Sequence, residues 1–251
     1  MFAEDALSLD EFLSGRLRLW QPLRGYRAAT DPVLLAASVP AEAGCRVLDL
    51  GCGAGAAGLC VAARVPGIAL AGLEVQPDYA DLARRNGTLN GVAFEVHAGD
   101  LRDMPGALRR DFDHVIANPP FYAPGGSVSP DPGRDRALRA EVPIADWLAA
   151  MTRRLRPGGM ATLIVAAELL PQALAGIGTL GSGRVLPLAA REGRAAGRII
   201  LQARKGGRGA FRLLAPLVLH RGAVHAGDRE SYTAEANAVL RDGMGLVELF
   251  R

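Results

Sequence analysis

The feature of the sequence that most constrains the fold is a buried stretch that breaks into a glycine-rich turn. Residues 46–50 predict a buried strand, and a G-x-G-x-G turn made of Gly51, Gly53 and Gly55 follows it directly. Glycines let the backbone turn tightly and let a ligand approach it closely. The apolar, alanine-rich residues 55–65 then predict a helix whose first N–H groups are free to bind a ligand. Alone, the turn is a weak signal, because a tight strand–helix turn can also lack a ligand.

The residues after this turn repeat the alternation of strand and helix. Residues 68–74, 93–97 and 113–117 predict strands, and residues 77–90 predict a helix that begins at a proline. This order indicates an α/β protein with a parallel sheet, doubly wound so that helices lie on both faces. The other expected elements are a short helix or turn over 6–12, a strand over 16–22, helices over 32–38, 143–155 and 168–177, a strand over 160–166, a flexible link over 178–183, strands over 185–189, 198–204 and 214–220, and a last helix over 231–240.

The chain shows no internal repeat and no second core-sized segment, so we expect one domain over residues 1–251. Within it, residues 1–43 would form an extension that covers the site, and residues 44–251 a Rossmann-like core. Proline and glycine crowd residues 123–142, which predicts a long loop that is functional or mobile.

Composition restricts the class of protein further. Hydrophobic residues make up 49% and charged residues 22% of the chain, which is typical of a globular protein. The net charge of +3 allows a polyanionic partner without requiring one. Cys45, Cys52 and Cys60 lack the spacing of metal ligands, so we expect reduced thiols, no metal and a cytoplasmic protein. The acidic first ten residues do not resemble a signal peptide, and no window approaches the roughly 20 apolar residues of a membrane span.

Three acidic residues stand where three successive predicted strands end: Asp49, Glu74 and Asp100. Because parallel strands end at the same edge of a sheet, their carboxylates can meet one ligand. Carboxylates suit an amine, a ribose and an adenine amino group, and they suit a pyrophosphate poorly. The set therefore favours S-adenosylmethionine over NAD, although any one of these acids alone can be a solvated strand end. We assign the neighbouring Cys52, Val75 and Leu101 to the same cofactor site.

The predicted strand over 113–117 runs directly into an Asn-Pro-Pro-aromatic motif. An exocyclic amine on an aromatic base, or an amide nitrogen, is a poor nucleophile because its lone pair is delocalised. Two carbonyl acceptors on its N–H bonds favour a pyramidal nitrogen, and the Asn118 side chain and the Pro119 backbone can supply them. Pro120 helps to fix the backbone, and the aromatic ring can stack on a base. The motif indicates methyl transfer to a planar amino nitrogen, although a proline-terminated strand with aromatic residues over the core would look the same. Its residues are Asn118, Pro119, Pro120, Phe121 and Tyr122.

Together these motifs resemble the class I S-adenosylmethionine-dependent methyltransferases, and within them the amino-methylating group marked by Asn-Pro-Pro-aromatic. Residues 21–36 (QPLRGYRAATDPVLLA) resemble the opening of the bacterial tRNA1(Val) adenine-N6 methyltransferase family, which modifies the adenine 3′ of the anticodon. Residues 198–206, 216–220 and 231–233 are similar to the tail of that family, so the resemblance covers nearly the whole chain. It implies a Rossmann-like sheet of seven strands in which the final strand is antiparallel.

The resemblance also assigns roles to residues. It implies that residues 26–31 close over the cofactor, with Thr30 or Asp31 near its methionine part. It implies that Glu74 binds the ribose and Asp100 the adenine. The full cofactor set is Tyr26, Thr30, Asp31, Asp49, Gly51, Cys52, Gly53, Gly55, Glu74, Val75, Asp100, Leu101 and Asn118. The catalytic set is Asn118, Pro119, Pro120 and Phe121.

The identity of the target is the less constrained part of this prediction. The family often has tyrosine after the two prolines, whereas here Phe121 comes first and Tyr122 second. The Asn-Pro-Pro-Phe form also occurs in guanine-N2 methyltransferases of ribosomal RNA. Glutamine-N5 methylation of a release factor is another alternative, although only about forty residues precede the glycine turn, too few for the helical substrate domain usual there. A cofactor-binding RNA scaffold without activity would not need the Asn-Pro-Pro motif.

Basic residues gather near the C-terminal strands, which favours tRNA as the partner if several of them share one face. Lys205 is the only lysine of the chain, so the abundance of arginine can also reflect a bias in codon usage. The cluster comprises Arg191, Arg194, Arg198, Arg204, Lys205, Arg208 and Arg212. The expected substrate-binding residues are Tyr122, Arg194, Arg198, Arg204 and Lys205.

Overall fold

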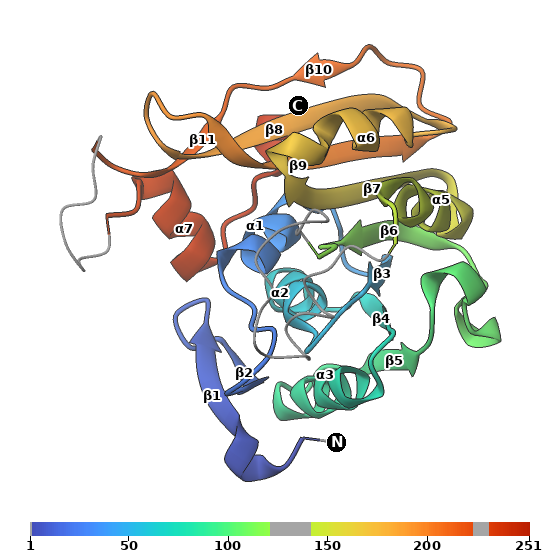
Figure 1. Cartoon of the computed structure of the whole chain (residues 1–251), viewed down its shortest axis with the longest axis vertical. Helices are drawn as coiled ribbons and strands as arrows, with labels where there is room; N and C mark the ends of the chain where they lie inside the picture. The colour runs from blue at the N-terminus through green and yellow to red at the C-terminus, as the bar shows by residue number, and fades with distance from the viewer. Residues whose placement is uncertain (1, 121–141, 223–230) are drawn as a thin grey trace.

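The computed structural model describes residues 2–120, 142–222 and 231–251. Within them, nine strands form one sheet in the order β10-β8-β9-β7-β6-β3-β4-β5, with β11 also paired to β8, and β1 and β2 form a separate hairpin (Figure 1). The strands are β1 (Leu7–Phe12), β2 (Leu17–Pro22), β3 (Arg46–Leu50), β4 (Ala69–Glu74), β5 (Phe94–Ala98), β6 (Phe112–Ala117), β7 (Leu155–Ala166), β8 (Leu180–Arg191), β9 (Ala196–Lys205), β10 (Arg212–Leu213) and β11 (Leu217–His220). The α-helices are α1 (Thr30–Ser38), α2 (Ala56–Arg64), α3 (Pro77–Leu89), α5 (Ile144–Arg154), α6 (Leu170–Ala175) and α7 (Ala234–Asp242).

The strand directions confirm the expected α/β fold. β3, β4, β5, β6 and β7 pair in parallel, so all five end at one edge of the sheet, which we call the carboxyl edge. β9 is antiparallel to both β7 and β8. The arrangement β5-β4-β3-β6-β7-β9-β8 is the expected seven-stranded sheet with one antiparallel strand. The short β10 and β11 extend it by pairing in parallel with β8.

Two layers of helices cover the two faces of the sheet. α1, α2 and α7 pack on one face, where Val47, Ile116 and Ile200 are completely buried. α5 and α6 pack on the other face against the alternate residues of the same strands, among them Leu48 and Val115. This alternation follows from the pleat of a strand, which sends successive side chains to opposite faces. None of the helices in the described ranges is long and apolar enough to cross a membrane.

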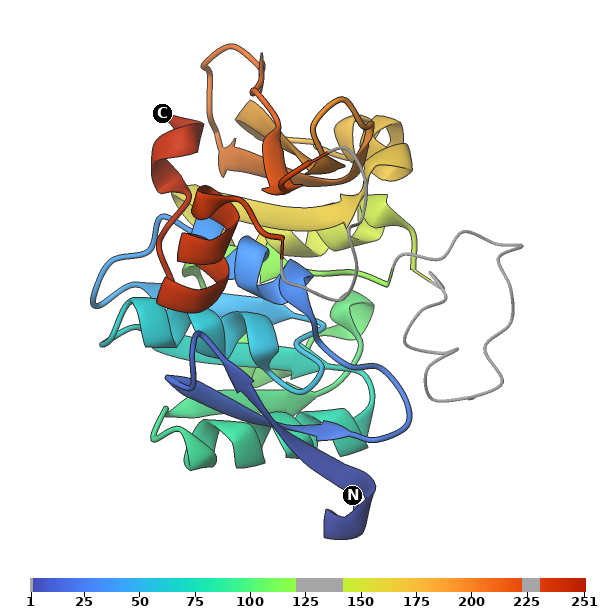
Figure 2. The same cartoon turned by 90° about the vertical axis from the view of Figure 1, so that its left-hand side faces the viewer.

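The β1–β2 hairpin is attached to the core by two asparagines, Asn86 of α3 and Asn90 directly after it. Asn86 accepts from the Trp20 N–H at 2.8 Å and donates to the Trp20 carbonyl at 3.0 Å. One turn later, Asn90 makes the same pair of hydrogen bonds with Arg18, at 3.0 and 2.7 Å. Residues four apart on a helix are about 6 Å apart along its axis, close to the rise of two residues in a strand. The two side-chain amides therefore bond to the backbone of β2 as a neighbouring strand would. Figure 2 shows the hairpin beside α2 and α3.

Three expectations about the chain are corrected. Residues 7–12 form the strand β1 instead of a helix or turn, because they pair with β2 from Leu7 to Phe12, and only Ala6 lies in a short helical turn. Residues 178–183 are not wholly a flexible link, because β8 begins at Leu180 and pairs with Lys205 of β9. The expected strand over 214–220 is shorter, since β11 begins after Pro216 and the separate β10 ends at Leu213.

Candidate functional site

The glycine turn after β3 is held tightly at the carboxyl edge of the sheet. The N–H groups of Gly51 and Cys52 both donate to the Leu73 carbonyl, at 2.7 and 3.0 Å. Gly51 has a φ of +67°, and a Cβ built there would lie 2.6 Å from the Trp147 ring. Glycine is therefore required both by the left-handed backbone and by the indole of α5 beneath the turn. Gly55 precedes α2 and does not line the pocket described below.

Asp49 is the most deeply buried acid at this edge, with only 1% of its surface exposed. Its Oδ2 accepts a hydrogen bond of 2.8 Å from the Gly58 N–H, in the first turn of α2. Burial raises the pKa of Asp49 to about 7, and the nearby Glu74 carboxylate adds to the rise. A carboxylate in this environment is stabilised by a bound positive charge.

Glu74, the last residue of β4, is also buried. Its two oxygens accept from the backbone N–H groups of Gly53 and Gln76, both at 2.9 Å. Burial nevertheless raises the pKa of this carboxyl above its usual value. Each carboxylate oxygen has a second lone pair, so Glu74 can still accept hydrogen bonds from ligand hydroxyls. The next residue, Val75, is 62% exposed, which is unusual for a large apolar side chain.

Asp100, the third acid of the predicted site, is engaged differently. It follows β5, and its carboxylate accepts from the Arg102 backbone at 2.8 Å and pairs with the Arg102 guanidinium at 2.6 Å. These hydrogen bonds hold the pKa of Asp100 below its usual value. The neighbouring Leu101 is buried. Neither residue lines the pocket at the glycine turn.

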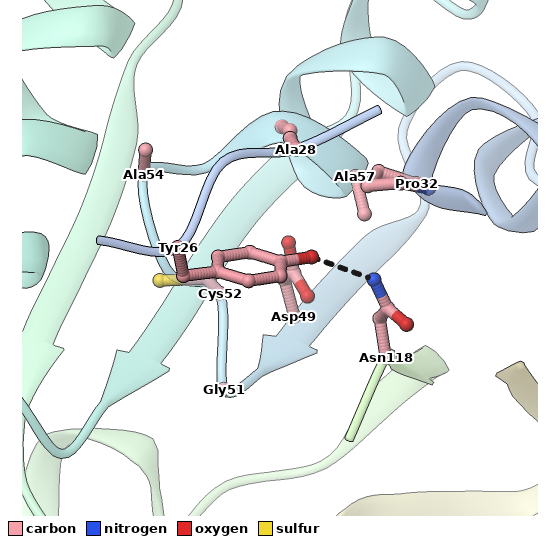
Figure 3. A pocket seen from close by; sticks show the side chains of 10 residues that line it. Tyr26, Ala28, Pro32, Asp49, Gly51, Cys52, Ala54, Ala57 and Asn118 are labelled. Atoms are coloured by element: carbon pink, nitrogen blue, oxygen red, sulfur yellow. Dashed lines mark hydrogen bonds between the residues drawn. The ribbon is translucent and has the colours of Figure 1, made fainter. Parts of the chain in front are cut away.

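A pocket of about 370 Å³, including its open mouth, lies between the glycine turn and the end of β6 (Figure 3). It brings together five predicted site residues from three separate parts of the sequence. The Tyr26 ring lies over Asp49, and its hydroxyl faces Asn118. The predicted residues that line the pocket are Tyr26, Asp49, Gly51, Cys52 and Asn118. The other lining residues are Ala28, Pro32, Ala54, Ala56 and Ala57.

Asn118 follows β6 directly and presents its amide to the pocket. Its Nδ2 donates to the Tyr26 hydroxyl at 3.3 Å. Its Oδ1 is buried and has no hydrogen-bond partner within the described residues. A buried acceptor without a partner is costly, so it marks a place where a donor is expected to bind. Pro119 is buried and Pro120 half-buried beside it, while Phe121 and Tyr122 lie outside the described residues.

The remaining predicted residues form two groups at opposite edges of the sheet. Thr30 begins α1, and Asp31 forms an ion pair of 3.2 Å with Arg198. Arg198 pairs in register with Ala166, the last residue of β7, so it lies at the carboxyl edge. Arg194 is exposed in the turn that precedes β9 and lies near the same edge.

Arg204 and Lys205 lie at the other edge, because β9 runs antiparallel to β7. Arg204 pairs in register with Met160, and its guanidinium donates to the Gly158 carbonyl at 2.9 Å. The Lys205 ammonium donates to the Leu155 carbonyl at 2.6 Å. Arg204 and Lys205 therefore lie at the opposite edge of the sheet from Arg198 and Asn118, so the basic residues expected to bind RNA do not all share one face.

Two residues that shape the site were not predicted. Tyr79 of α3 bonds to the backbone of Tyr26, and Gln21 of β2 bonds to the backbone of Ala28. Gln21 is only 2% exposed, so it is a buried polar residue at the end of a strand. A glutamine before Pro22 carries no local signal for this role, because its partner lies seven residues later in a loop.

The acids at this edge of the sheet suit S-adenosylmethionine, with Asp49 lining the pocket and Glu74 lying beside it. This cofactor has a positively charged sulfonium and amino group, and no cation of the described residues offsets the burial of Asp49. It also has ribose hydroxyls, which suit the free lone pairs of Glu74 at the end of the neighbouring strand. S-adenosylmethionine is therefore the cofactor that this edge of the sheet can accept.

Comparisons with known proteins identify the family of the chain. A family model described as "Methyltransferase small domain" matches residues 29–173, more than half of the chain. A tRNA1(Val) (adenine(37)-N6)-methyltransferase from Yersinia enterocolitica is 35% identical over 114 residues, which cover 44% of this chain and 45% of that protein. The chain thus matches less than half the length of this relative.

Solved structures share the fold. A predicted O-methyltransferase from Agrobacterium tumefaciens superposes with a TM-score of 0.68 and 28% identity, over 86% of this chain and 97% of that one. A 16S rRNA guanine-N2 methyltransferase from Thermus thermophilus, in complex with S-adenosylmethionine and guanosine, has a TM-score of 0.55 and 20% identity, over 79% of this chain and 50% of that one. The chain therefore belongs to the methyltransferase small domain family of class I, S-adenosylmethionine-dependent methyltransferases.

Proposed function

We propose that the protein transfers a methyl group from S-adenosylmethionine to the exocyclic N6 amine of an adenine in tRNA, next to the anticodon. The observation that carries this proposal is the Asn118 Oδ1, a buried acceptor without a partner in the described residues, at the pocket that contains Asp49. An amino group is the donor that such an oxygen is suited to bind.

The reaction requires the protein mainly to position the two reactants and to bind the charged cofactor. When bound, S-adenosylmethionine supplies an electrophilic methyl group on its sulfonium. Asn118 accepts one N–H of the target amine, and the Pro119 carbonyl accepts the other, so that the nitrogen lone pair is directed toward the cofactor. Asp49 and Glu74 hold the cofactor by its charged and hydroxyl groups. The nitrogen becomes acidic once it is alkylated, so no strong general base is required at Asn118.

The choice of adenine in tRNA rests on the curated relative and on the distribution of charge. The Yersinia relative is named for adenine-N6 methylation of tRNA1(Val). Arg194 and Arg198 lie at the same edge of the sheet as Asn118 and would contact the phosphates that flank the target base. Phe121 and Tyr122 would stack on that base.

Truncation of Asn118 tests the catalytic part of the proposal. We expect Asn118→Ala to lower kcat for tRNA methylation about 100-fold, because an acceptor that acts mainly in the transition state is lost. The dissociation constant of S-adenosylmethionine should stay within about threefold, because the change leaves Asp49 and Glu74 in place. Asn90→Ala is the matched control, since it truncates the same residue type directly after α3, away from the pocket. Methyl transfer at the wild-type rate by Asn118→Ala would refute the role of Asn118.

A further inference from the structure

We propose that Tyr26 is a positioning residue that sets the orientation of the Asn118 amide, and that Tyr79 and Gln21 hold Tyr26 in place for this purpose. This inference rests on the proposed function, because it concerns which atom of Asn118 meets the target amine. It gives Tyr26 a second role and adds Tyr79 and Gln21 to the machinery of the site.

The amide of Asn118 has to present a particular atom to its target. Its oxygen accepts hydrogen bonds and its nitrogen donates them, and rotation by 180° exchanges the two in nearly the same space. A target amine with two N–H bonds needs the amide oxygen of Asn118, because only the oxygen accepts a hydrogen bond. The Nδ2 of Asn118 is engaged by the Tyr26 hydroxyl at 3.3 Å, which leaves Oδ1 for the target. Without that hydroxyl, both orientations of the amide become accessible.

The charges around Tyr26 favour the orientation in which its hydroxyl accepts. Burial holds the pKa of the Tyr26 hydroxyl far above its usual value, and the nearby Asp31 and Asp49 add to the rise. The group therefore keeps its proton. The charge of Asp31, together with that of Asp49 above pH 7 where it is ionised, favours an O–H bond that points toward these carboxylates. The lone pairs of the oxygen are then left for the Asn118 N–H. In Figure 3 the Tyr26 hydroxyl is joined to the Asn118 amide by this hydrogen bond.

The backbone of Tyr26 is clamped by a single side chain. The Tyr79 hydroxyl accepts from the Tyr26 N–H at 2.8 Å and donates to the Tyr26 carbonyl at 3.1 Å. Tyr79 itself is only 4% exposed, so its ring is fixed by packing. Gly25 makes room for this approach, because a Cβ at that position would lie 2.7 Å from the Tyr79 hydroxyl. The position of Tyr26 is thus determined by α3.

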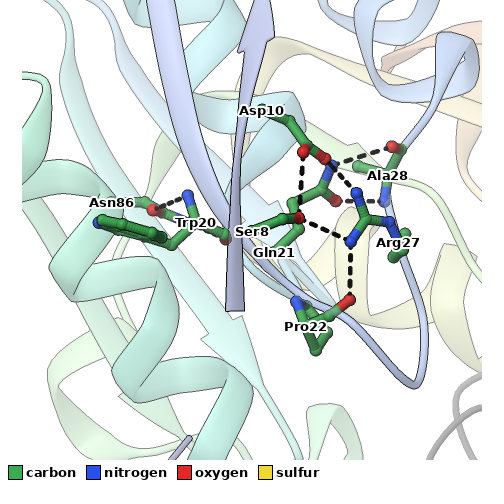
Figure 4. A network of polar contacts seen from close by, with 8 residues as sticks. All are labelled: Ser8, Asp10, Trp20, Gln21, Pro22, Arg27, Ala28 and Asn86. Atoms are coloured by element: carbon green, nitrogen blue, oxygen red, sulfur yellow. Dashed lines mark hydrogen bonds and ion pairs between the residues drawn. The ribbon is translucent and has the colours of Figure 1, made fainter. Parts of the chain in front are cut away.

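A second clamp holds the chain on the other side of Tyr26 (Figure 4). The Gln21 side chain accepts from the Ala28 N–H at 2.7 Å and donates to the Ala28 carbonyl at 3.3 Å. Its Nε2 also donates to Asp10 at 2.6 Å, and Asp10 pairs with Arg27. Because the backbone is fixed at Tyr26 and again at Ala28, the Tyr26 hydroxyl is held at Asn118 with little conformational freedom.

The decisive variant is Tyr26→Phe, which keeps the ring over the pocket and removes only the hydroxyl. We expect kcat to fall about tenfold, because one hydrogen bond that orients Asn118 is lost. The dissociation constant of S-adenosylmethionine, measured by calorimetry, should stay within about twofold because the ring still covers the site. Tyr79→Phe should lower kcat in the same direction, and Tyr232→Phe, a matched change near β11, should leave it unchanged.

A second readout does not depend on turnover. The side-chain amide signals of Asn118 in a ¹⁵N–¹H spectrum can be assigned from their absence in Asn118→Asp. We expect these signals to shift in Tyr26→Phe and to stay in place in Tyr232→Phe. Unchanged Asn118 signals in Tyr26→Phe would overturn the inference. A wild-type kcat together with a weakened affinity for S-adenosylmethionine would also overturn it, because Tyr26 would then only cover the cofactor. If the wild-type protein methylates no tRNA, the proposed function fails, and the amide signals still decide whether Tyr26 orients Asn118.

Discussion

The Asp49 carboxylate accepts a 2.8 Å hydrogen bond from the Gly58 N–H while only 1% of the residue is exposed. This bond fixes the acid at the start of α2 and orients it toward the pocket that Tyr26 covers. A single backbone donor does not offset the loss of water around a charge, so the pKa of Asp49 rises to about 7. The site therefore has a carboxyl that changes its charge near neutral pH.

The first prediction concerns the pH dependence of cofactor binding. In the free protein Asp49 is largely protonated below pH 7, and a positively charged ligand binds its ionised form more strongly. Affinity for S-adenosylmethionine should therefore rise with pH up to about 7, by at most about tenfold per pH unit, and binding below that pH should release a proton. Calorimetry in two buffers of different ionisation enthalpy measures both quantities.

The control for this prediction is a pair of neutral variants. Asp49→Asn should remove the pH dependence, and Glu74→Gln should retain most of it, although the pKa of Glu74 is also raised by burial. The same pH dependence in Asp49→Asn as in the wild type would assign the titration to another group.

The second prediction concerns the two asparagines that attach the hairpin to α3. Asn86 is fully buried and also donates to the Ala54 carbonyl at 2.9 Å, so Asn86→Ala leaves several buried backbone groups without partners. We expect it to lower the free energy of unfolding by about 3 kcal/mol. Asn90→Ala removes the equivalent bonds to Arg18 where water can replace them, and should cost about 1 kcal/mol. Urea unfolding measures both, and equal losses would contradict the role given to burial.

The third prediction concerns RNA contacts. Arg194 lies near the carboxyl edge, whereas Arg204 lies at the opposite edge of the sheet. Arg194→Ala should weaken tRNA binding and reduce the slope of log affinity against log salt concentration by about one. Arg204→Ala removes the same charge and should leave that slope unchanged. Filter binding at several salt concentrations measures both slopes. A reduced slope in Arg204→Ala and an unchanged slope in Arg194→Ala would place the RNA-binding surface at the other edge.

Much of the fold could be predicted because the signals are local. The strand over 46–50 coincides with β3, and the helix expected over 77–90 differs from α3 (Pro77–Leu89) by one residue. Both are marked by their own residues, an apolar run before glycines in one case and Pro77 in the other. β1 could not be predicted in this way, since its partner is β2 and the pair is held by Asn86 of α3 and by Asn90 directly after it.

The same difference between local signals and long-range contacts applies to the residues of the site. Residues of the glycine turn and Asn118 were predicted because each follows a strand whose end is visible in the sequence. The contact between Tyr26 and Asn118 joins residues 92 positions apart, and the Gln21 and Tyr79 clamps have no local pattern. The separation of Arg204 from Arg198 follows from the antiparallel direction of β9, because the two residues lie at opposite ends of that strand.

The central claim is that the target is the N6 amine of an adenine in tRNA. The most direct measurement is to incubate the protein with S-adenosylmethionine carrying an isotopically labelled methyl group and with separate pools of tRNA, ribosomal RNA and release factors, and then to identify the labelled product by mass spectrometry. We predict labelled N6-methyladenosine from the tRNA pool, and its loss in Asn118→Ala. Label on guanine N2, on a hydroxyl oxygen or on a glutamine side chain, with none on tRNA adenine, would contradict the account.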